Sequence, residues 1–400
     1  MSAPSKLPPF DPSDPLGVDD LLDPEDLAIR DTVRSWAADR VLPHIADWYE
    51  RGELPGIREL ARELGSIGAL GMSLKGYGCA GATAVQYGLA CLELEAADSG
   101  IRSLVSVQGS LAMYAIHRFG SEEQKQRWLP GMAAGEIIGC FGLTEPDHGS
   151  DPAGMRTFAK RDGSDWVLTG RKMWITNGSV AGVAVVWART ADEDGGGIRG
   201  FVVPTDVPGF SAPEIKHKWS LRASVTSELV LDEVRLPADA VLPGVIGLKG
   251  PLNCLTHARY GIVWGSMGAA RSSFESAVEY SKTREQFGRP IGGFQLTQAK
   301  LADMAVELHK GILLAHHLGR RMDAGTLRPE QVSFGKLNNV REAIEICRTS
   351  RTILGANGIS LEYPVMRHAT NLESVLTYEG TVEMHQLVLG KALTGLDAFR

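Results

Sequence analysis

Short runs of β-branched and aromatic residues are concentrated in the middle of this chain, and helical patterns occupy both ends. Between about Ile137 and Leu242 lie the runs VAVVWA (183–188), GFVVP (200–204) and ELVLDEVRL (228–236), separated by Gly, Asp and Asn. Runs of this length and composition predict strands. On both sides, apolar residues recur at spacings of three and four, which predicts helices. The order helices, strands, helices therefore predicts an α+β fold that is mostly helical, with its strands in a central domain.

Helix-start signals support this division. Pro24 is followed by Glu25 and Asp26, and an imino acid with carboxylates in the first turn favours a helix N-terminus. Residues 121–124 read Ser-Glu-Glu-Gln, which is a capping box. After Gly250, apolar residues fall on one helical face at Leu301, Met304, Leu308, Ile312, Ala315 and Met322. Long helices joined by short turns predict a bundle.

These boundaries predict three domains. They are an N-terminal helical domain over residues 1–136, a central β-sandwich or barrel domain over 137–248, and a C-terminal helical bundle over 249–400. The proline-rich segment 1–22 is expected to be an extended arm that packs on another part of the molecule or frays.

Composition limits the partners. The 400 residues carry a formal net charge of -7, so no chain-wide basic field for DNA or RNA is present. No apolar run approaches the roughly 20 residues of a spanning helix, and the N-terminus is rich in Pro and Asp instead of the Arg and Ser of an import signal. The five cysteines include no C-x-x-C pair, which argues against structural zinc. We expect a cytoplasmic protein without nucleic acid, membrane or metal.

Three local patterns have a simple structural interpretation. Residues 195–200 match G-x-G-x-x-G, but they precede a strand instead of following one, so we predict a hairpin loop. Residues 333–336 match S-x-x-K without the companion motifs of a nucleophile, and we expect a surface helix there. His316 and His317 are adjacent helix positions that point apart, which favours a solvated pair over a metal site.

Four other segments each allow a structural and a functional interpretation. Residues 139–151 (GCFGLTEPDHGSD) form a Gly-rich hairpin or a loop whose N–H groups and hydroxyls meet a phosphate or a polar ring edge. Residues 172–178 (KMWITNG) place Trp174 in the core or beside a ligand. Residues 283–291 (TREQFGRPI) end a helix with a C-cap and surface ion pairs or with a phosphate site. Residues 354–360 (LGANGIS) provide a C-cap or a close approach of backbone to a ligand.

The segment TYEGT (377–381) contains a carboxylate, Glu379, between an aromatic residue and a glycine. At the start of a predicted helix it is either a cap on the helix dipole or a desolvated base. The pattern alone favours the cap.

Taken together and in this order, these segments resemble the acyl-CoA dehydrogenase family of flavoproteins. The resemblance is carried by GLTEPDHGSD, MWITNG, REQFGRPI, LGANGI and YEGT, and it covers nearly the whole chain. Within the family it is nearest to the members that oxidise glutaryl-CoA, through LEAADSGIRSLVSVQGSL (94–111), CLTHARYGI (254–262) and NLESVLTYEGT (371–381). It implies a four-helix bundle at the C-terminus, FAD between this bundle and the β-domain, and a homotetramer.

The resemblance also implies the cofactor-binding residues. Residues of the β-domain would contact the flavin, and residues near the ends of the C-terminal helices would bind the pyrophosphate and adenosine of a neighbouring subunit's FAD. The full set is Phe141, Gly142, Leu143, Thr144, Gly149, Ser150, Trp174, Ile175, Thr176, Arg284, Phe287, Gln295, Leu354, Gly355, Ala356, Asn357, Gly358, Thr381 and Glu383.

For the reaction, the resemblance implies that Glu379 is the base and that Glu95 and Tyr378 accompany decarboxylation. The other position used by relatives for the base is Ala258 here. Substrate contacts are expected from Arg102, Ser103, Ser106, Ser150, Arg259 and Gly380, with Arg102 gripping a distal carboxylate. A surface ion pair of Arg102 with Asp98 is the structural alternative.

The implied activity is oxidative decarboxylation of glutaryl-CoA to crotonyl-CoA and CO2, with electrons passing to an electron-transferring flavoprotein. Ile101 and Gly109 stand where many relatives carry Tyr and Ser. The alternatives are a dehydrogenase for another short or branched acyl-CoA, or a non-catalytic helical scaffold.

Overall fold

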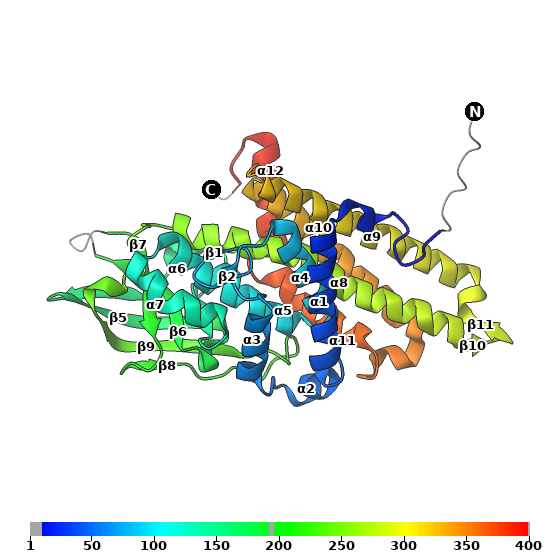
Figure 1. Ribbon diagram of the computed structural model, residues 1–400, viewed down its shortest axis with the longest axis horizontal. Coiled ribbons are helices and arrows are strands. Elements are labelled where there is room, and N and C mark those ends of the chain that lie inside the picture. The colour runs from blue at the N-terminus through cyan, green and yellow to red at the C-terminus, as the bar shows by residue number, and fades with distance from the viewer. Residues whose placement is uncertain (1–9, 192–195, 399–400) are drawn as a thin grey trace.

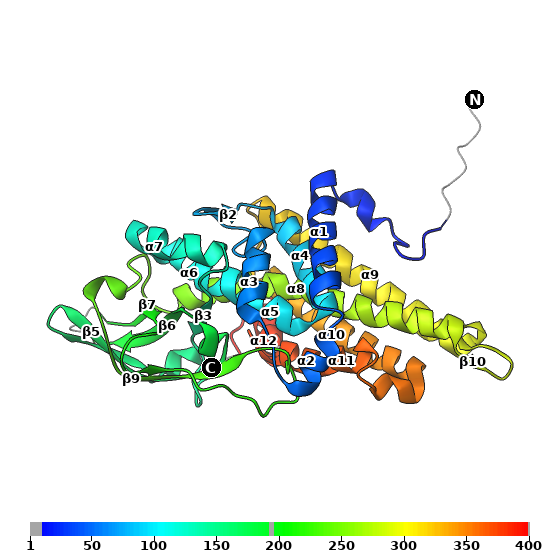
Figure 2. The same cartoon turned by 60° about the horizontal axis from the view of Figure 1, so that its bottom comes forward.

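A computed structural model describes residues 10–191 and 196–398 of the chain. Figure 1 shows an elongated molecule with a β-sheet at one end and long helices at the other. The N-terminal helices lie between these two parts (Figures 1 and 2). The predicted order of helices, strands and helices is confirmed, and so is the mostly helical α+β class.

The N-terminal part is a set of packed helices, the first of which begins at the predicted Pro24. Asp23 caps the first helix by accepting hydrogen bonds from Glu25 N and Asp26 N. Ser121 and Gln124 form the predicted capping box. The helices are α1 (Pro24–Arg40), α2 (Ile45–Arg51), α3 (Ile57–Ser66), α4 (Ala84–Ala97), α5 (Ser99–Ser106), α6 (Tyr114–Phe119) and α7 (Glu122–Ala133). A π-helical segment (Val107–Met113) joins α5 to α6, and the two-residue strands β1 (Lys75–Gly76) and β2 (Cys79–Ala80) form a small hairpin.

The central part is one curled sheet, which is the half-barrel form of the predicted β-domain. Its strands are β3 (Gly139–Gly142), β4 (Phe158–Asp162), β5 (Asp165–Thr176), β6 (Val183–Thr190), β7 (Ile198–Pro204), β8 (Phe210–Ser211) and β9 (Thr226–Leu236). The order is β3-β6-β4-β5-β9-β8, and β7 pairs with β6.

Strand β6 is buried on both faces. Val183, Val185 and Trp187 pack with residues of α6 and α7, while Ala184 and Val186 pack inside the curl of the sheet. A strand covered on both sides needs a nearly continuous apolar run, which explains the sequence VAVVWA. Figure 2 shows α6 and α7 lying over this part of the sheet.

The described part of the G-x-G-x-x-G pattern, residues 196–200, runs from the end of a loop into strand β7. Strand β6 pairs with β7 so that Arg189 lies opposite Ile198, which confirms the predicted hairpin. Residues 192–195 of this loop, including Gly195, lie outside the described residues.

The C-terminal part is built around one long helix. Its elements are α8 (Lys249–Thr283), β10 (Glu285–Gln286), β11 (Arg289–Pro290), α9 (Gln295–Asp323), α10 (Pro329–Leu354), α11 (Pro364–Thr377) and α12 (Val382–Thr394). The apolar face predicted for residues 301–322 packs inward from α9, with Met304, Leu308 and Ala315 buried. No helix in the described ranges has the length and apolar character that crossing a membrane requires.

Close packing of α4 on α8 depends on glycine. A Cβ atom at Gly268 would lie 1.9 Å from Leu92 O, and one at Gly265 would lie 2.1 Å from Glu95 Oε2. Glycine at position 268 therefore lets the two helix backbones approach, and glycine at position 265 leaves room for the Glu95 carboxylate between the helices. The approach brings the buried face of α4 against the middle of α8.

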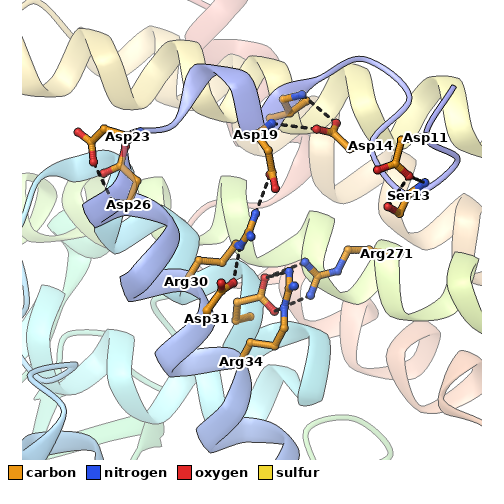
Figure 3. A network of polar contacts seen from close by, with 12 residues as sticks. Asp11, Ser13, Asp14, Asp19, Asp23, Asp26, Arg30, Asp31, Arg34 and Arg271 are labelled. Carbon is orange, nitrogen blue, oxygen red and sulfur yellow. Dashed lines mark hydrogen bonds and ion pairs between the residues drawn. The ribbon is translucent and has the colours of Figure 1, made fainter. Parts of the chain in front are cut away.

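A buried carboxylate ties three helices together. The Glu93 side chain on α4 is 1% exposed and accepts hydrogen bonds from Arg34 of α1 and Arg271 of α8. Figure 3 shows the two arginines of this triad, Arg34 and Arg271, near Arg30. Arg30 pairs with Asp19 and so anchors the segment before α1. The predicted N-terminal arm therefore packs on the protein through its described residues, whereas residues 1–9 lie outside them.

Replacing Glu93 by Gln is expected to lower the free energy of unfolding by about 3 kcal/mol, because a half-paired Arg271 remains buried. Burial alone would raise the pKa of Glu93, but the two arginines hold it below the ordinary value of 4.5. A carboxylate with a depressed folded-state pKa stabilises the fold above its unfolded-state pKa, and this contribution is lost as pH falls through the folded-state value. The difference in the free energy of unfolding between wild type and variant should therefore become smaller below about pH 4.5.

Urea unfolding at pH 7 and at pH 4 measures this difference. Glu345→Gln is the matched control, because Glu345 forms an exposed pair with Arg348 and its loss should cost under about 1 kcal/mol. An equal decrease in the free energy of unfolding for the two variants would contradict a structural role for the Glu93 triad.

Candidate active site

A cavity of about 1240 Å³ lies where the sheet meets the helices. Its walls come from β3, β5 and the loop after β3 on one side, and from α5, α8 and the turn between α11 and α12 on the other. Ligand pockets are usually about 300–1,000 Å³, so this cavity has room for two bound molecules side by side.

Most of the residues predicted from the sequence to form the site line this one cavity. They come from segments almost 280 residues apart, and the fold brings them together. The predicted residues in its wall are Arg102, Ser103, Phe141, Leu143, Thr144, Gly149, Ser150, Trp174, Ile175, Thr176, Arg259, Tyr378, Glu379, Gly380 and Thr381.

Four other predicted residues lie close to the cavity without forming its wall. Glu95 and Ser106 are buried behind it, Gly142 lies on the buried strand β3, and Glu383 lies in the first turn of α12. Ile101 and Gly109, the two departures from the family pattern, are also buried and are not among the described residues that line the cavity.

The remaining predicted cofactor residues lie elsewhere in the chain. Arg284, Phe287 and Gln295 are exposed around the hairpin β10–β11, at the end of the molecule opposite the sheet (Figure 1). The turn 354–358 joins this group, because Asn357 Nδ2 donates to Tyr280 OH near the end of α8. The structure thus forms two separate groups of predicted cofactor residues on one chain.

Trp174 faces the cavity and does not belong to the core, so the core interpretation of this residue is wrong. Its side chain is 58% exposed and its backbone φ is 63°. The pairing of β5 with β9 shifts between Lys172 and Ile175, which marks a β-bulge. A bulge breaks the alternation of a strand and re-aims a side chain, and here the indole is exposed in the cavity wall.

The loop after β3 is fixed by a buried ion pair. Glu145 accepts hydrogen bonds from Arg156 N at 2.6 Å, Thr157 N at 2.8 Å and Lys172 Nζ at 2.8 Å. Burial opposes its charge, but these donors lower the pKa of Glu145 to about 2. The loop residues that line the cavity, including Thr144, therefore sit on a rigid support.

Glu379 lies in the turn between α11 and α12, in the left-handed region with φ of 52°. The cap interpretation is wrong, because Thr381 is the N-cap residue of α12 and accepts from Met384 N. Within the described part of the chain, Glu379 Oε2 is buried and has no hydrogen-bond partner. Burial raises the pKa of Glu379, although the charges of Arg102, Lys336 and Arg259 oppose the rise.

Arg102 is buried at the floor of the cavity, with its side chain 1% exposed. Its Nε donates to Glu95 Oε2 at 2.7 Å, and its Nη2 donates to Tyr378 OH. The alternative pairing with Asp98 is wrong, because Asp98 caps α5 at Gly100 N and pairs with Arg367. Burial disfavours the charge, but Glu95 and Tyr378 raise the pKa of Arg102 above its ordinary value.

Lys336 was missed from the sequence, and the expectation of a surface helix at residues 333–336 is wrong. On α10, Ser333 and Lys336 are buried beside the turn that carries Glu379. Ser333 Oγ and His385 Nδ1 lie 3.0 Å apart and share a hydrogen bond. The signal in the sequence was the apolar stripe Val332, Val340, Ala343 and Cys347, because Lys336 falls on the same helical face.

A loop from the β-domain was also missed. Lys218, Trp219, Ser220 and Leu221 line the cavity, and Leu221 N donates to Asn371 Oδ1 of α11. The loop carries no motif, and its place depends on this contact between parts of the chain 150 residues apart.

The floor of the cavity can accept an anion. Arg102, Arg259 and Lys336 interact electrostatically with Glu379, and Arg102 pairs with Glu95. With Lys336 charged, these groups supply three positive and two negative charges, which leaves one positive charge in excess. Burial lowers the pKa of Lys336 to about 7, so this excess is complete only below that pH. A bound carboxylate would neutralise this buried excess of positive charge.

Glu379 is the carboxylate in the cavity wall that is available for proton transfer. Of the other carboxylates that line the described cavity, Glu145 is held by Lys172, and Glu373 pairs with Arg348 on the surface. The second position considered for a base, Ala258, is a buried residue of α8. A desolvated carboxylate next to a cavity with room for a ligand can remove a proton from a carbon acid.

Comparison with known proteins gives a consistent result along the chain. Family models of the acyl-CoA dehydrogenase N-terminal, middle and C-terminal domains match residues 23–136, 140–234 and 247–394. The short-chain specific acyl-CoA dehydrogenase of human mitochondria is 34% identical over 90% of this chain and 87% of its own length.

Solved structures are more similar still. A crystal structure of a glutaryl-CoA dehydrogenase from Mycobacterium smegmatis has a TM-score of 0.95 at 72% identity, over 97% of this chain and 99% of that one. A second glutaryl-CoA dehydrogenase structure from the same organism, in complex with FADH2, has a TM-score of 0.94 at 64% identity, over 96% and 98% of the two chains.

Gly265→Ala is expected to destabilise the protein by about 1–3 kcal/mol, because the new methyl group would displace the Glu95 carboxylate that orients Arg102. Gly390→Ala on α12 is the matched control, since no atom lies within 4 Å of the added Cβ. That change should stabilise the helix by about 0.5–1 kcal/mol. Thermal or urea unfolding compares the two, and effects of the same sign would contradict the close α4–α8 contact.

Proposed function

Because the chain belongs to the acyl-CoA dehydrogenase family, we propose that it is an FAD-dependent enzyme that converts glutaryl-CoA to crotonyl-CoA and CO2. The main support for glutaryl-CoA as the substrate is Arg102. Its guanidinium is buried at the floor of the cavity, in a cluster with excess positive charge. The similar glutaryl-CoA dehydrogenase structures support this choice.

The cavity fits FAD together with a thioester substrate. Its volume exceeds that of a usual single-ligand pocket, and the bulge at Trp174 presents a flat aromatic face to it. We propose that Trp174 stacks on the isoalloxazine, that Thr176 contacts its polar edge, and that Phe141 to Thr144 and Ser150 line it. Thr381 and Glu383 complete this half of the site. When bound, FAD supplies a hydride acceptor.

The second group of predicted residues would serve another subunit. Arg284, Phe287, Gln295 and residues 355–357 are exposed at one end of the molecule, and the buried Leu354 and Gly358 flank them. We propose that they bind the pyrophosphate and adenosine of a neighbouring subunit's FAD in a homotetramer. Arginine suits the pyrophosphate because its planar fork binds phosphate oxygens.

Glu379 removes the proton alpha to the thioester. Burial raises the pKa of its carboxyl group, so the carboxylate is a stronger base than one in water. Its Oε2 is buried and, among the described residues, unpartnered, so the lone pairs are available for the substrate proton. The backbone N–H of Glu379 would hold the thioester oxygen, where negative charge develops.

Arg102 selects the distal carboxylate. Glu95 and Tyr378 each accept one hydrogen bond from the guanidinium and so fix its plane. The buried hydroxyl of Ser103 lies in the same wall, next to Tyr378. Ser103, Ser106, Ser150, Arg259 and Gly380 would complete the substrate contacts.

Decarboxylation follows from the product of the first step. Glu379 would take the alpha proton and bound FAD would supply the acceptor for the beta hydride, so that the unsaturated five-carbon acyl-CoA results. Its bond to the distal carboxylate then breaks, CO2 leaves, and the electron pair moves through the double bond toward the thioester. Glu379 returns its proton to carbon, and crotonyl-CoA results. Burial raises the pKa of Tyr378 to about 12, so its hydroxyl stays protonated beside Arg102. Reduced enzyme would pass its electrons to an electron-transferring flavoprotein.

Glu379→Gln is expected to keep the yellow flavin and to lose bleaching of its absorbance by substrate, because the amide cannot accept the alpha proton. The turnover number should fall at least about 10⁴-fold, in the upper range for a general base. Stopped-flow absorbance under anaerobic conditions measures this. Retained bleaching would remove Glu379 from its role as base.

The substrate is tested with a panel of glutaryl-, butyryl- and isovaleryl-CoA, with CO2 trapped. Wild type should prefer glutaryl-CoA and release one CO2 per turnover. Arg102→Ala should lower kcat/KM for glutaryl-CoA by about 10²-fold or more and change that for butyryl-CoA much less, because only the former loses a charge pair.

The FAD content of each variant reports whether the site is intact. Equal or better use of the monoacids by wild type would favour a dehydrogenase for another short or branched acyl-CoA. A protein that cannot take up FAD would favour the non-catalytic scaffold. A uniform loss across all substrates would contradict the role of Arg102.

A further inference from the structure

Lys336 is a buried cation that the proposed chemistry does not use. It lies on α10 with 2% of its surface exposed, and it is not among the described residues that form the cavity wall. Burying an ammonium group costs several kcal/mol unless its N–H groups donate hydrogen bonds. The acceptors of Lys336 Nζ therefore show which part of the protein this lysine stabilises.

Those contacts are backbone carbonyls of the turn that carries Glu379. Lys336 Nζ donates to Tyr378 O and to Gly380 O, both at 2.6 Å. The carbonyl between them, Glu379 O, accepts from Arg259 Nε at 2.5 Å. Two cations from two different helices, α10 and α8, therefore bind three consecutive carbonyls.

The turn needs such support because its backbone is strained. Glu379 has φ of 52° and Gly380 has φ of 103°. A left-handed conformation at a residue other than glycine costs about 1–3 kcal/mol and persists only where the surroundings impose it. Without the ammonium group, the carbonyls of Tyr378 and Gly380 would be buried without their donor, and the turn would relax.

We propose that Lys336 is a positioning residue that holds the Glu379 carboxylate in its proton-accepting place by clamping the carbonyls on either side of it. This inference rests on Glu379 being the base. Lys336 acts through the backbone of the turn and through its charge, and it does not touch the substrate.

The charge adds a second effect on Glu379. In its charged form Lys336 lowers the pKa of Glu379 against the rise caused by burial, and burial lowers the pKa of Lys336 itself to about 7. The groups that face this pair are Glu95 on α4, Arg102 on α5, Arg259 on α8, Tyr378 in the turn and His385 on α12. Burial lowers the pKa of His385 to about 3, so it is neutral near pH 7, and removal of Lys336 leaves Arg102 and Arg259 as the cations near Glu379.

Lys336→Met tests the proposal in the FAD-loaded enzyme. With the best acyl-CoA of the panel, kcat should fall about 10–100-fold with little change in KM, because the base is misplaced while the binding groups remain. The acidic limb of the kcat profile should move upward by about one pH unit, because loss of a neighbouring cation raises the pKa of a carboxyl group. Lys391→Met, an exposed lysine of α12, is the control and should match wild type.

A readout independent of turnover separates this inference from the proposed function. Infrared spectroscopy follows the carboxyl band of protonated Glu379 against pH, with Glu379→Gln identifying the band. Lys336→Met should shift this titration upward even if wild type does not oxidise glutaryl-CoA. An unshifted titration together with wild-type kcat would overturn the proposal.

Lys336→Arg covers the case in which the methionine variant does not fold. Arginine keeps a cation with several N–H donors, so this variant should retain at least about a tenth of wild-type kcat and an unshifted acidic limb. A folded, FAD-loaded Lys336→Arg enzyme with no measurable turnover would also overturn the proposal.

Discussion

The buried charge cluster at the floor of the cavity is the constraint on which the rest of the structure depends. Arg102, Arg259 and Lys336 come from three helices, and Glu95 and Glu379 come from a fourth helix and a turn. Such groups are stable away from water only when each is paired or hydrogen-bonded. The packing of α4, α5, α8 and α10 must therefore be accurate at this point, and the glycines of α8 make the approach of α4 possible.

Much of the fold could be predicted from the sequence because local signals agree with the tertiary structure. The caps at Asp23 and Ser121 and the apolar run of β6 follow rules that involve only neighbouring residues. The residues of the cavity wall were found through the family resemblance, since no local rule joins Trp174 to Glu379. These residues come together only in the folded chain, and their spacing along the sequence does not predict that they do.

The errors at the site have specific physical causes. Asp98 and Arg102 are four residues apart, which would pair them on a continuous helix. The chain instead ends α4 at Ala97, and Asp98 becomes the cap of α5, so the partner of Arg102 is Glu95. Lys336 was assigned to a surface because lysine is usually exposed, although its helical face is apolar. The left-handed backbone of Trp174 and Glu379 has no signal in the residue types.

Charge balance connects the cluster to substrate choice. Glu95 alone would neutralise Arg102 if the pair were isolated, and Arg102 would then serve structure only. The pair is not isolated, because Arg102, Arg259 and Lys336 all act on the single carboxylate of Glu379. Under the proposed mechanism the proton passes from the substrate to Glu379, so the acyl group becomes negatively charged while the carboxylate becomes neutral. A distal carboxylate bound at Arg102 would offset the positive excess of the cluster, whereas a monoacid cannot. We propose on this basis that the cluster favours a dicarboxylic acyl group.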